Sequence, residues 1–94
     1  VSEETAQLMA VRCRKLFSST YSIAVTGIAG PGGGTSEKPV GTVFISVAGI
    51  DQESVTRELS LGSMDRLLFK KEVAEKALRM IETFTRKHYY PLIN

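Results

Sequence analysis

The sequence predicts a small α/β domain whose elements follow the order helix, strand, strand, strand, helix. Two observations support this prediction: an amphipathic pattern lies at each end of the chain, and short apolar runs lie between them. With 94 residues the chain forms one domain at most. Five such elements make either a compact α+β unit or half of an α/β sandwich whose first strands lie upstream.

The first helix is predicted to begin after Ser2 and to end near Phe17. Ser2 is a good N-cap, and the negative charges of Glu3 and Glu4 are favourable near the positive end of the helix dipole. Apolar residues then recur at spacings of three and four, which predicts one buried stripe that includes Cys13 as a small core residue. The stripe consists of Ala6, Met9, Ala10, Cys13, Leu16 and Phe17.

Three strands are predicted in the middle of the chain. Residues 21–26 are apolar or small on both faces, which is typical of a buried strand. Residues 40–48 and 54–61 form an antiparallel hairpin around a turn at 49–52. The second helix is predicted from Met64 to about Lys87, with Ser63 as its cap and with Tyr89, Tyr90 and Pro91 ending it.

The segment Val25-Thr-Gly-Ile-Ala-Gly-Pro-Gly-Gly-Gly joins the first two strands and is the most informative part of the sequence. Glycine-rich backbone after a strand exposes N–H groups that hold anions. Neither common nucleotide-binding motif fits. A Walker loop has lysine directly after its last glycine, whereas Thr35 follows Gly34 here. The dinucleotide fingerprint has glycine at its last position, which is Thr35 in this sequence. The segment is therefore either an anion-binding loop or a plain surface loop.

Arg66 is the second candidate for a binding residue. If Ser63 is the cap, Arg66 lies in the first helical turn, where a cation opposes the helix dipole at a cost of about 0.3 to 1 kcal/mol. A phosphate or carboxylate at the same helix terminus would account for this placement. The alternative is an ordinary surface arginine that Asp65 and solvent neutralise.

Composition and charge narrow the function classes. The net charge of +2 is spread along the chain, so the sequence predicts binding to neither nucleic acid nor membrane. Apolar runs are far shorter than the roughly 18 residues of a membrane-spanning helix. The single cysteine, Cys13, is typical of a reducing cytoplasm. The single histidine, His88, makes a zinc site improbable, and no metal is expected.

Three segments of the chain can be compared with known families: Val1-Ser-Glu-Glu-Thr-Ala, Ala24-Val-Thr-Gly-Ile-Ala-Gly-Pro-Gly-Gly-Gly-Thr and Lys38-Pro-Val-Gly-Thr-Val. Together they resemble the CinA C-terminal domain family, the bacterial competence/damage-inducible proteins also known as nicotinamide-nucleotide amidohydrolases. The resemblance extends from residue 1 to the last helix.

The resemblance implies a three-layer α/β/α sandwich with a mixed sheet. It also implies hydrolysis of the carboxamide of nicotinamide mononucleotide to nicotinate mononucleotide and ammonia, as part of pyridine-nucleotide recycling, with no cofactor and no metal. Arg66, in Ser63-Met64-Asp65-Arg66, matches the arginine that the family carries at the start of its last helix, and the resemblance implies that it pairs with the substrate phosphate or orients it. The expected substrate-binding residues are Thr26, Gly27, Ile28, Ala29, Gly30 and Arg66.

The family's catalytic motifs do not occur among these 94 residues. The family domain carries a Glu-Ser-x-Thr-Gly-Gly segment with the serine nucleophile, then a Tyr-Ser-Asn segment and a lysine, all before the Val-Ser-Glu-Glu motif. We therefore expect residues 1–94 to be the C-terminal portion of the domain, without catalytic residues and inactive alone. An alternative function is a non-catalytic nucleotide-binding or assembly module. In that case an uncovered sheet edge would favour a homo-oligomer. A third hypothesis is an α+β domain whose glycine-rich loop has no function.

Overall fold

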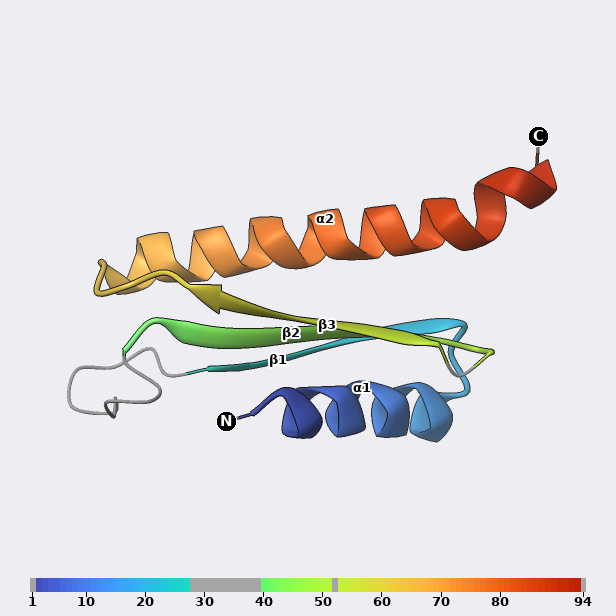
Figure 1. Cartoon of the computed structure of the whole chain (residues 1–94), viewed down its shortest axis with the longest axis horizontal. Coiled ribbons are helices and arrows are strands. Elements are labelled where there is room, and N and C mark those ends of the chain that lie inside the picture. Colours follow the sequence, from blue (N-terminus) through green and yellow to red (C-terminus); the bar gives the residue numbers. More distant parts are fainter. Residues whose placement is uncertain (1, 28–39, 52, 94) are drawn as a thin grey trace.

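The computed structural model describes residues 2–27, 40–51 and 53–93, with side chains up to Arg86. The predicted order of elements is confirmed (Figure 1). The elements are α1 (Glu3–Phe17), β1 (Tyr21–Gly27), β2 (Thr42–Gly49), β3 (Ser54–Ser60) and α2 (Arg66–Ile93).

The three strands form one sheet in the order β1-β2-β3, with α1 on one face and α2 on the other (Figure 1). This is the three-layer α/β/α arrangement. Both described pairings are antiparallel: Ile23 pairs with Val47 across β1 and β2, and Val47 pairs with Val55 across β2 and β3. Within the described residues the sheet thus contains no parallel pair, so these strands alone do not show the expected mixed character.

The limits of α1 are those predicted, and its caps account for them, the N-cap at Ser2 as predicted and a C-cap at Ser18 that was not. The Ser2 hydroxyl oxygen accepts a hydrogen bond from the backbone N–H of Thr5 at 3.0 Å. At the other end Ser18 adopts the left-handed conformation, with φ 52°, and its N–H donates to the carbonyl of Lys15. This geometry satisfies carbonyl groups of the last turn and ends the helix.

Mainly small side chains form the interface between α1 and the sheet, and the larger Phe44, which is 5% exposed, lies on the same face near the start of β2. Ala10 is completely buried and packs with Ala24 of β1 and Ala48 of β2. The Ser22 hydroxyl donates a hydrogen bond to the Ala10 carbonyl, which ties β1 to the helix backbone. Of the stripe predicted to be buried, only Ala6 and Ala10 are; Cys13 is half-buried, and the larger members are exposed. Large side chains there would hold the helix away from the sheet.

Larger side chains form the interface between the sheet and α2. Val43 and Ile45 of β2 pack with Phe69 and Ala77 of α2 in one buried cluster. Strand β2 is buried throughout, because it has a strand on each side and a helix on each face. β1 is less covered than the sequence predicts: Val25, on the α2 side, is 40% exposed.

Helix α2 begins and ends later than predicted. Its N-cap is Asp65 rather than Ser63, since the Asp65 carboxylate accepts from the N–H of Leu68 at 3.2 Å and its carbonyl accepts from Phe69. The helix continues beyond Lys87 to Ile93, so the expectation that Tyr89–Pro91 ends it is wrong.

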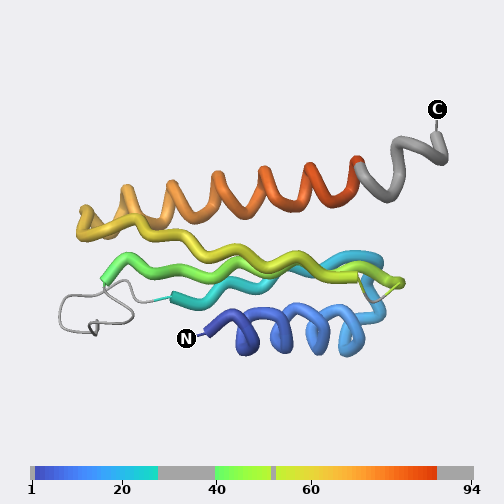
Figure 2. The backbone as a smooth tube through the Cα atoms, viewed as in Figure 1, coloured from blue at the N-terminus to red at the C-terminus, as the bar shows by residue number. Residues whose placement is uncertain are grey.

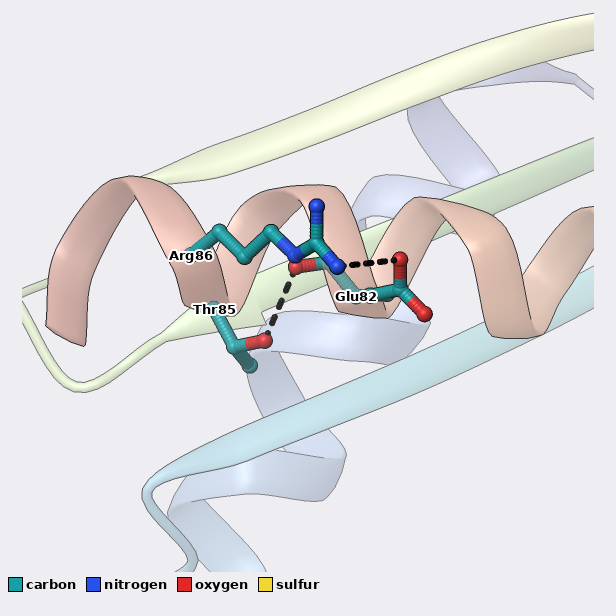
Figure 3. Close-up of polar contacts among 3 residues, drawn as sticks. All are labelled: Glu82, Thr85 and Arg86. Carbon is teal, nitrogen blue, oxygen red and sulfur yellow. Dashed lines mark hydrogen bonds and ion pairs between the residues drawn. The ribbon is translucent and has the colours of Figure 1, made fainter. Parts of the chain in front are cut away.

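The outer side of α2 near its C-terminal half carries local polar contacts (Figure 3). Arg86 forms an ion pair with Glu82 one turn earlier at 3.3 Å, and the Thr85 hydroxyl donates to the Glu82 carbonyl at 3.0 Å. Both charged side chains are more than 60% exposed, so this pair contributes little stability.

Candidate functional site

The candidate site lies at one end of the sheet, where β1 ends and β2 begins. Gly27 is paired with Val43, and Thr42 with Ser60 at the end of β3. The N–H of Leu61 then donates to the carbonyl of Gly41 at 3.0 Å. The start of α2 follows a few residues later, at the end of the sheet opposite the β2–β3 turn (Figure 2).

Two glycines bring the entry to β2 and the exit from β3 into direct contact. Gly41 has a φ of +93° and Gly62 a φ of +71°, values that L residues rarely adopt. A Cβ atom on Gly41 would overlap the backbone nitrogen and oxygen of Gly62. The backbone of the two turns can therefore approach this closely only without a side chain at position 41.

A third glycine, Gly27, closes β1 where the predicted binding segment begins. A Cβ atom there would lie 2.9 Å from the Thr42 carbonyl oxygen and 3.0 Å from a Val43 methyl group. Gly27 is exposed and the preceding Thr26 is half-buried. Of the predicted binding residues, Ile28, Ala29 and Gly30 lie outside the described residues.

Arg66 is the first residue of α2, immediately after the capping Asp65. Its side chain is exposed, and within the described part of the chain it forms neither an ion pair nor a hydrogen bond. The Asp65 carboxylate faces the helix N–H group of Leu68 instead. The guanidinium is therefore available to an anion at this end of the sheet, beside a helix terminus that already holds one carboxylate.

The fold brings Thr26, Gly27 and Arg66 to the same end of the sheet, although 39 positions separate Gly27 from Arg66 in the sequence. Sequence reasoning missed Gly41 and the capping role of Asp65, and it assigned Gly62 only to the end of the third strand. The glycines carried a signal, since Gly41 is the second residue of the predicted strand 40–48 and Gly62 directly follows the strand 54–61. Asp65 was hidden by Ser63, because both residue types cap helices.

Two other kinds of feature, metal-binding groups and membrane-spanning helices, concern the same described residues. These residues contain no group of three or more His, Cys, Asp or Glu side chains placed to hold a metal ion. None of their helices combines the length and the apolar character needed to cross a membrane.

The sequence model of the CinA C-terminal domain matches residues 1–85. This chain belongs to the CinA C-terminal domain family. It is similar to the CinA-like protein of Desulfosudis oleivorans, with 46% identity over 87 residues, which is 93% of this chain and 20% of that protein. It is also similar to the CinA-like protein of Chloroherpeton thalassium, with 46% identity over 84 residues, or 86% of this chain and 20% of that protein.

Solved structures of the CinA family have the same fold. A competence/damage inducible protein from Agrobacterium tumefaciens superposes with a TM-score of 0.86 at 34% identity, covering 90% of this chain and 52% of that one. A competence-damaged protein (CinA) superfamily protein from Enterobacter cloacae gives 0.78 at 29% identity, with 88% and 48% covered. The chain thus spans about half the length of these structures and about a fifth of the two CinA-like proteins.

Proposed function

We propose that this CinA-family chain supplies the nucleotide-binding part of a domain that hydrolyses the carboxamide of nicotinamide mononucleotide. In this reaction the serine hydroxyl adds to the carboxamide carbon and the C–N bond breaks to release ammonia; water then cleaves the serine ester and releases nicotinate mononucleotide. Membership of the family supports a hydrolase in general. The inference that nicotinamide mononucleotide is the substrate rests on the resemblance of the glycine-rich segment and of Ser63-Met64-Asp65-Arg66 to the corresponding segments of the family.

The observation that carries the proposal is the unpartnered guanidinium of Arg66 at the end of the sheet where β1 runs into the glycine-rich segment. A nucleoside monophosphate offers a dianionic phosphate that an arginine binds in two-pronged fashion. In the proposed site Arg66 holds this phosphate. Thr26, Gly27 and the backbone N–H groups of Ile28, Ala29 and Gly30 line the rest of the pocket.

The proposed division of labour leaves bond cleavage to residues outside this chain. A serine nucleophile and an assisting lysine or tyrosine would come from the other half of the family domain, and the glycine-rich backbone would stabilise negative charge on the substrate. No metal or cofactor takes part in this scheme. The reaction would take place in the cytoplasm, in keeping with the single cysteine.

The proposal is tested by titrating the 94-residue chain with nicotinamide mononucleotide in a calorimeter and assaying ammonia release in parallel. We expect binding without turnover. Arg66→Ala should weaken binding roughly tenfold or more, because a hydrogen bond between charged groups is lost, whereas Arg12→Ala, an exposed arginine on α1, should leave it unchanged. Ammonia release by the chain alone would contradict the division of labour; unchanged affinity in Arg66→Ala would contradict the site.

A second candidate function is that of an assembly module, favoured by the apolar side chains that α1 leaves exposed. Leu16 and Phe17 are 78% and 72% exposed, and Leu8 and Met9 are also exposed. Apolar surface of this kind marks contacts with other protein. We propose that the chain forms a homo-oligomer through it. Light scattering on the unmodified chain should give a mass above 10.3 kDa, which falls to the monomer mass in the double variant Leu16→Ser/Phe17→Ser. A monomeric mass for the unmodified chain would refute the proposed homo-oligomer.

A further inference from the structure

A groove of about 310 Å³ lies between β3 and the middle of α2. It is separate from the candidate site. Lys76 in its wall is ten residues beyond Arg66, about 15 Å along the helix at 1.5 Å per residue. The strand wall runs from Val55, which pairs with Val47 near the β2–β3 turn, to Leu59, which pairs with Val43 on the side of β2 away from Gly27. An occupant of the groove would therefore not compete with a ligand at Arg66.

The Phe84 ring in the apolar lining of the groove is held in place by its neighbours in the fold. Phe84 is only 5% exposed, and its ring meets that of Tyr21 edge to face, with centroids 5.7 Å apart. Gly49 makes room for the ring, since a Cβ there would lie 3.0 Å from its Cε1 atom. Val55 and Met80 extend this apolar surface. A fixed surface of this kind accepts a flat or aliphatic hydrocarbon without first being ordered.

All the charged side chains that line the groove are cations: Arg57 from β3, and Lys76 and Arg79 from α2. Within the described part of the chain none of the three forms an ion pair or a hydrogen bond. A volume near 310 Å³ lies at the lower end of the range for small-molecule sites.

The nearby carboxylates do not neutralise these three cations. Glu72 and Glu75 stand one turn before Lys76 and Arg79 on α2, but neither comes within ion-pair distance of them. Glu82 is engaged with Arg86. Glu58 of β3 pairs with Phe44, whereas the neighbouring Arg57 and Leu59 turn to the groove face. The groove therefore combines an apolar floor with a positive rim.

We propose that this groove binds a small organic acid with an apolar body. The anionic group lies between Arg57 and Arg79, with Lys76 nearby, and the hydrocarbon rests on Phe84, Val55 and Met80. Inorganic phosphate alone would gain nothing from the apolar floor, and a neutral hydrocarbon would leave the cations without a counter-charge. Both halves of the ligand are therefore needed, and this requirement distinguishes the site from the phosphate site proposed at Arg66.

The test is a titration of the ¹⁵N-labelled 94-residue chain with 2-naphthoate, compared with neutral 2-naphthamide and with inorganic phosphate. We expect saturable shifts in the amides of residues 55–59 and 76–84 with 2-naphthoate, and at least tenfold weaker responses to the other two. Arg57→Gln and Arg79→Gln should each weaken naphthoate binding several-fold or more. Both side chains are exposed, so the fold should be kept.

The matched control is Arg12→Gln, which removes the same charge from an exposed position on α1, across the sheet, and should leave binding unchanged. Equal responses to naphthoate and naphthamide would overturn the proposal. So would shifts spread over the whole surface, or a loss in Arg12→Gln as large as that in Arg79→Gln. Binding of an acidic apolar peptide in the groove without binding of naphthoate would assign it to a protein partner and also overturn the proposal.

Discussion

The two faces of the sheet are packed by different means. On the α1 face alanine and serine side chains let most of the helix lie close to the strands, with Ala6 and Ala10 fully buried, and the larger Phe44 is buried near the start of β2. On the α2 face Val43, Ile45 and Phe69 fill a thicker layer that opens into the groove beside β3. Close approach leaves no room for a ligand, whereas a thicker layer that is not completely filled does. The difference predicts opposite tolerances to changes in side-chain size.

The largest effect is expected for removing volume from the filled part of the α2 face. Ile45 is completely buried among Val43, Phe69 and Ala77. Ile45→Ala should lower the free energy of unfolding by about 2–5 kcal/mol, measured by urea denaturation. Val55→Ala, on the same face but at the 39% exposed groove wall, should cost much less. Equal losses would show that the groove wall is packed like the core.

Adding volume to the α1 face should have the next largest effect. Ala10→Leu would push α1 away from Ala24 and Ala48 and should cost about 1–3 kcal/mol of unfolding free energy. Val55→Leu, which adds one carbon atom at the groove, should change stability by less than about 0.5 kcal/mol. Thermal unfolding of both variants measures the contrast. A tolerated Ala10→Leu would mean that α1 can move away from the sheet without cost.

A smaller loss is expected at the start of α2. Asp65→Ala removes the acceptor for the Leu68 N–H group and should cost about 0.5–2 kcal/mol, while Asp65→Asn should retain most of the cap. Ser63→Ala serves as the control, because Ser63 does not cap the helix. If Ser63→Ala proved the more costly change, the predicted cap would be right and the observed one wrong.

The smallest effect is expected on the outer side of α2. Glu82→Gln breaks the exposed ion pair with Arg86 and should cost no more than about 0.5 kcal/mol, a difference that raised salt concentration should reduce further. Chemical denaturation at low and high salt measures it. A loss above 1 kcal/mol would place Glu82 in a larger network than the pair in Figure 3.

The order of elements could be predicted from the sequence because it follows from local patterns: the cap at Ser2, the apolar spacing of α1 and the alternation in β3. The packing could not be. Periodicity marks Leu16 and Phe17 as apolar, but which residues of the stripe are buried depends on how closely the helix approaches the sheet. The end of α2 was missed at Tyr89 and Tyr90 because aromatic residues carry only a small helix penalty, about 0.5 kcal/mol each. The helix also continues through Pro91, although proline costs about 3 kcal/mol in a helix interior, and helix propensity does not explain this.

The candidate site could be predicted in part. The glycine-rich segment stood out by its composition, and Arg66 stood out as a cation in the first turn of a helix. The strand register brings Gly27, where the segment begins, and the start of α2 to the same end of the sheet. The contact of Gly41 with Gly62 could not be anticipated, because it is made between backbones that are 21 positions apart. The groove likewise depends on the position of α2 over β3, which no local pattern specifies.

The contact between Gly41 and Gly62 has a consequence for comparing sequences of this family. Any relative that keeps this crossing must lack a side chain at the position of Gly41, and it needs a residue that tolerates positive φ at the position of Gly62. We therefore expect an alignment to show an invariant glycine at position 41 and, at position 62, glycine or another residue that adopts positive φ, such as asparagine. The first would invite assignment as a ligand contact, although the meeting of two turns is what requires it.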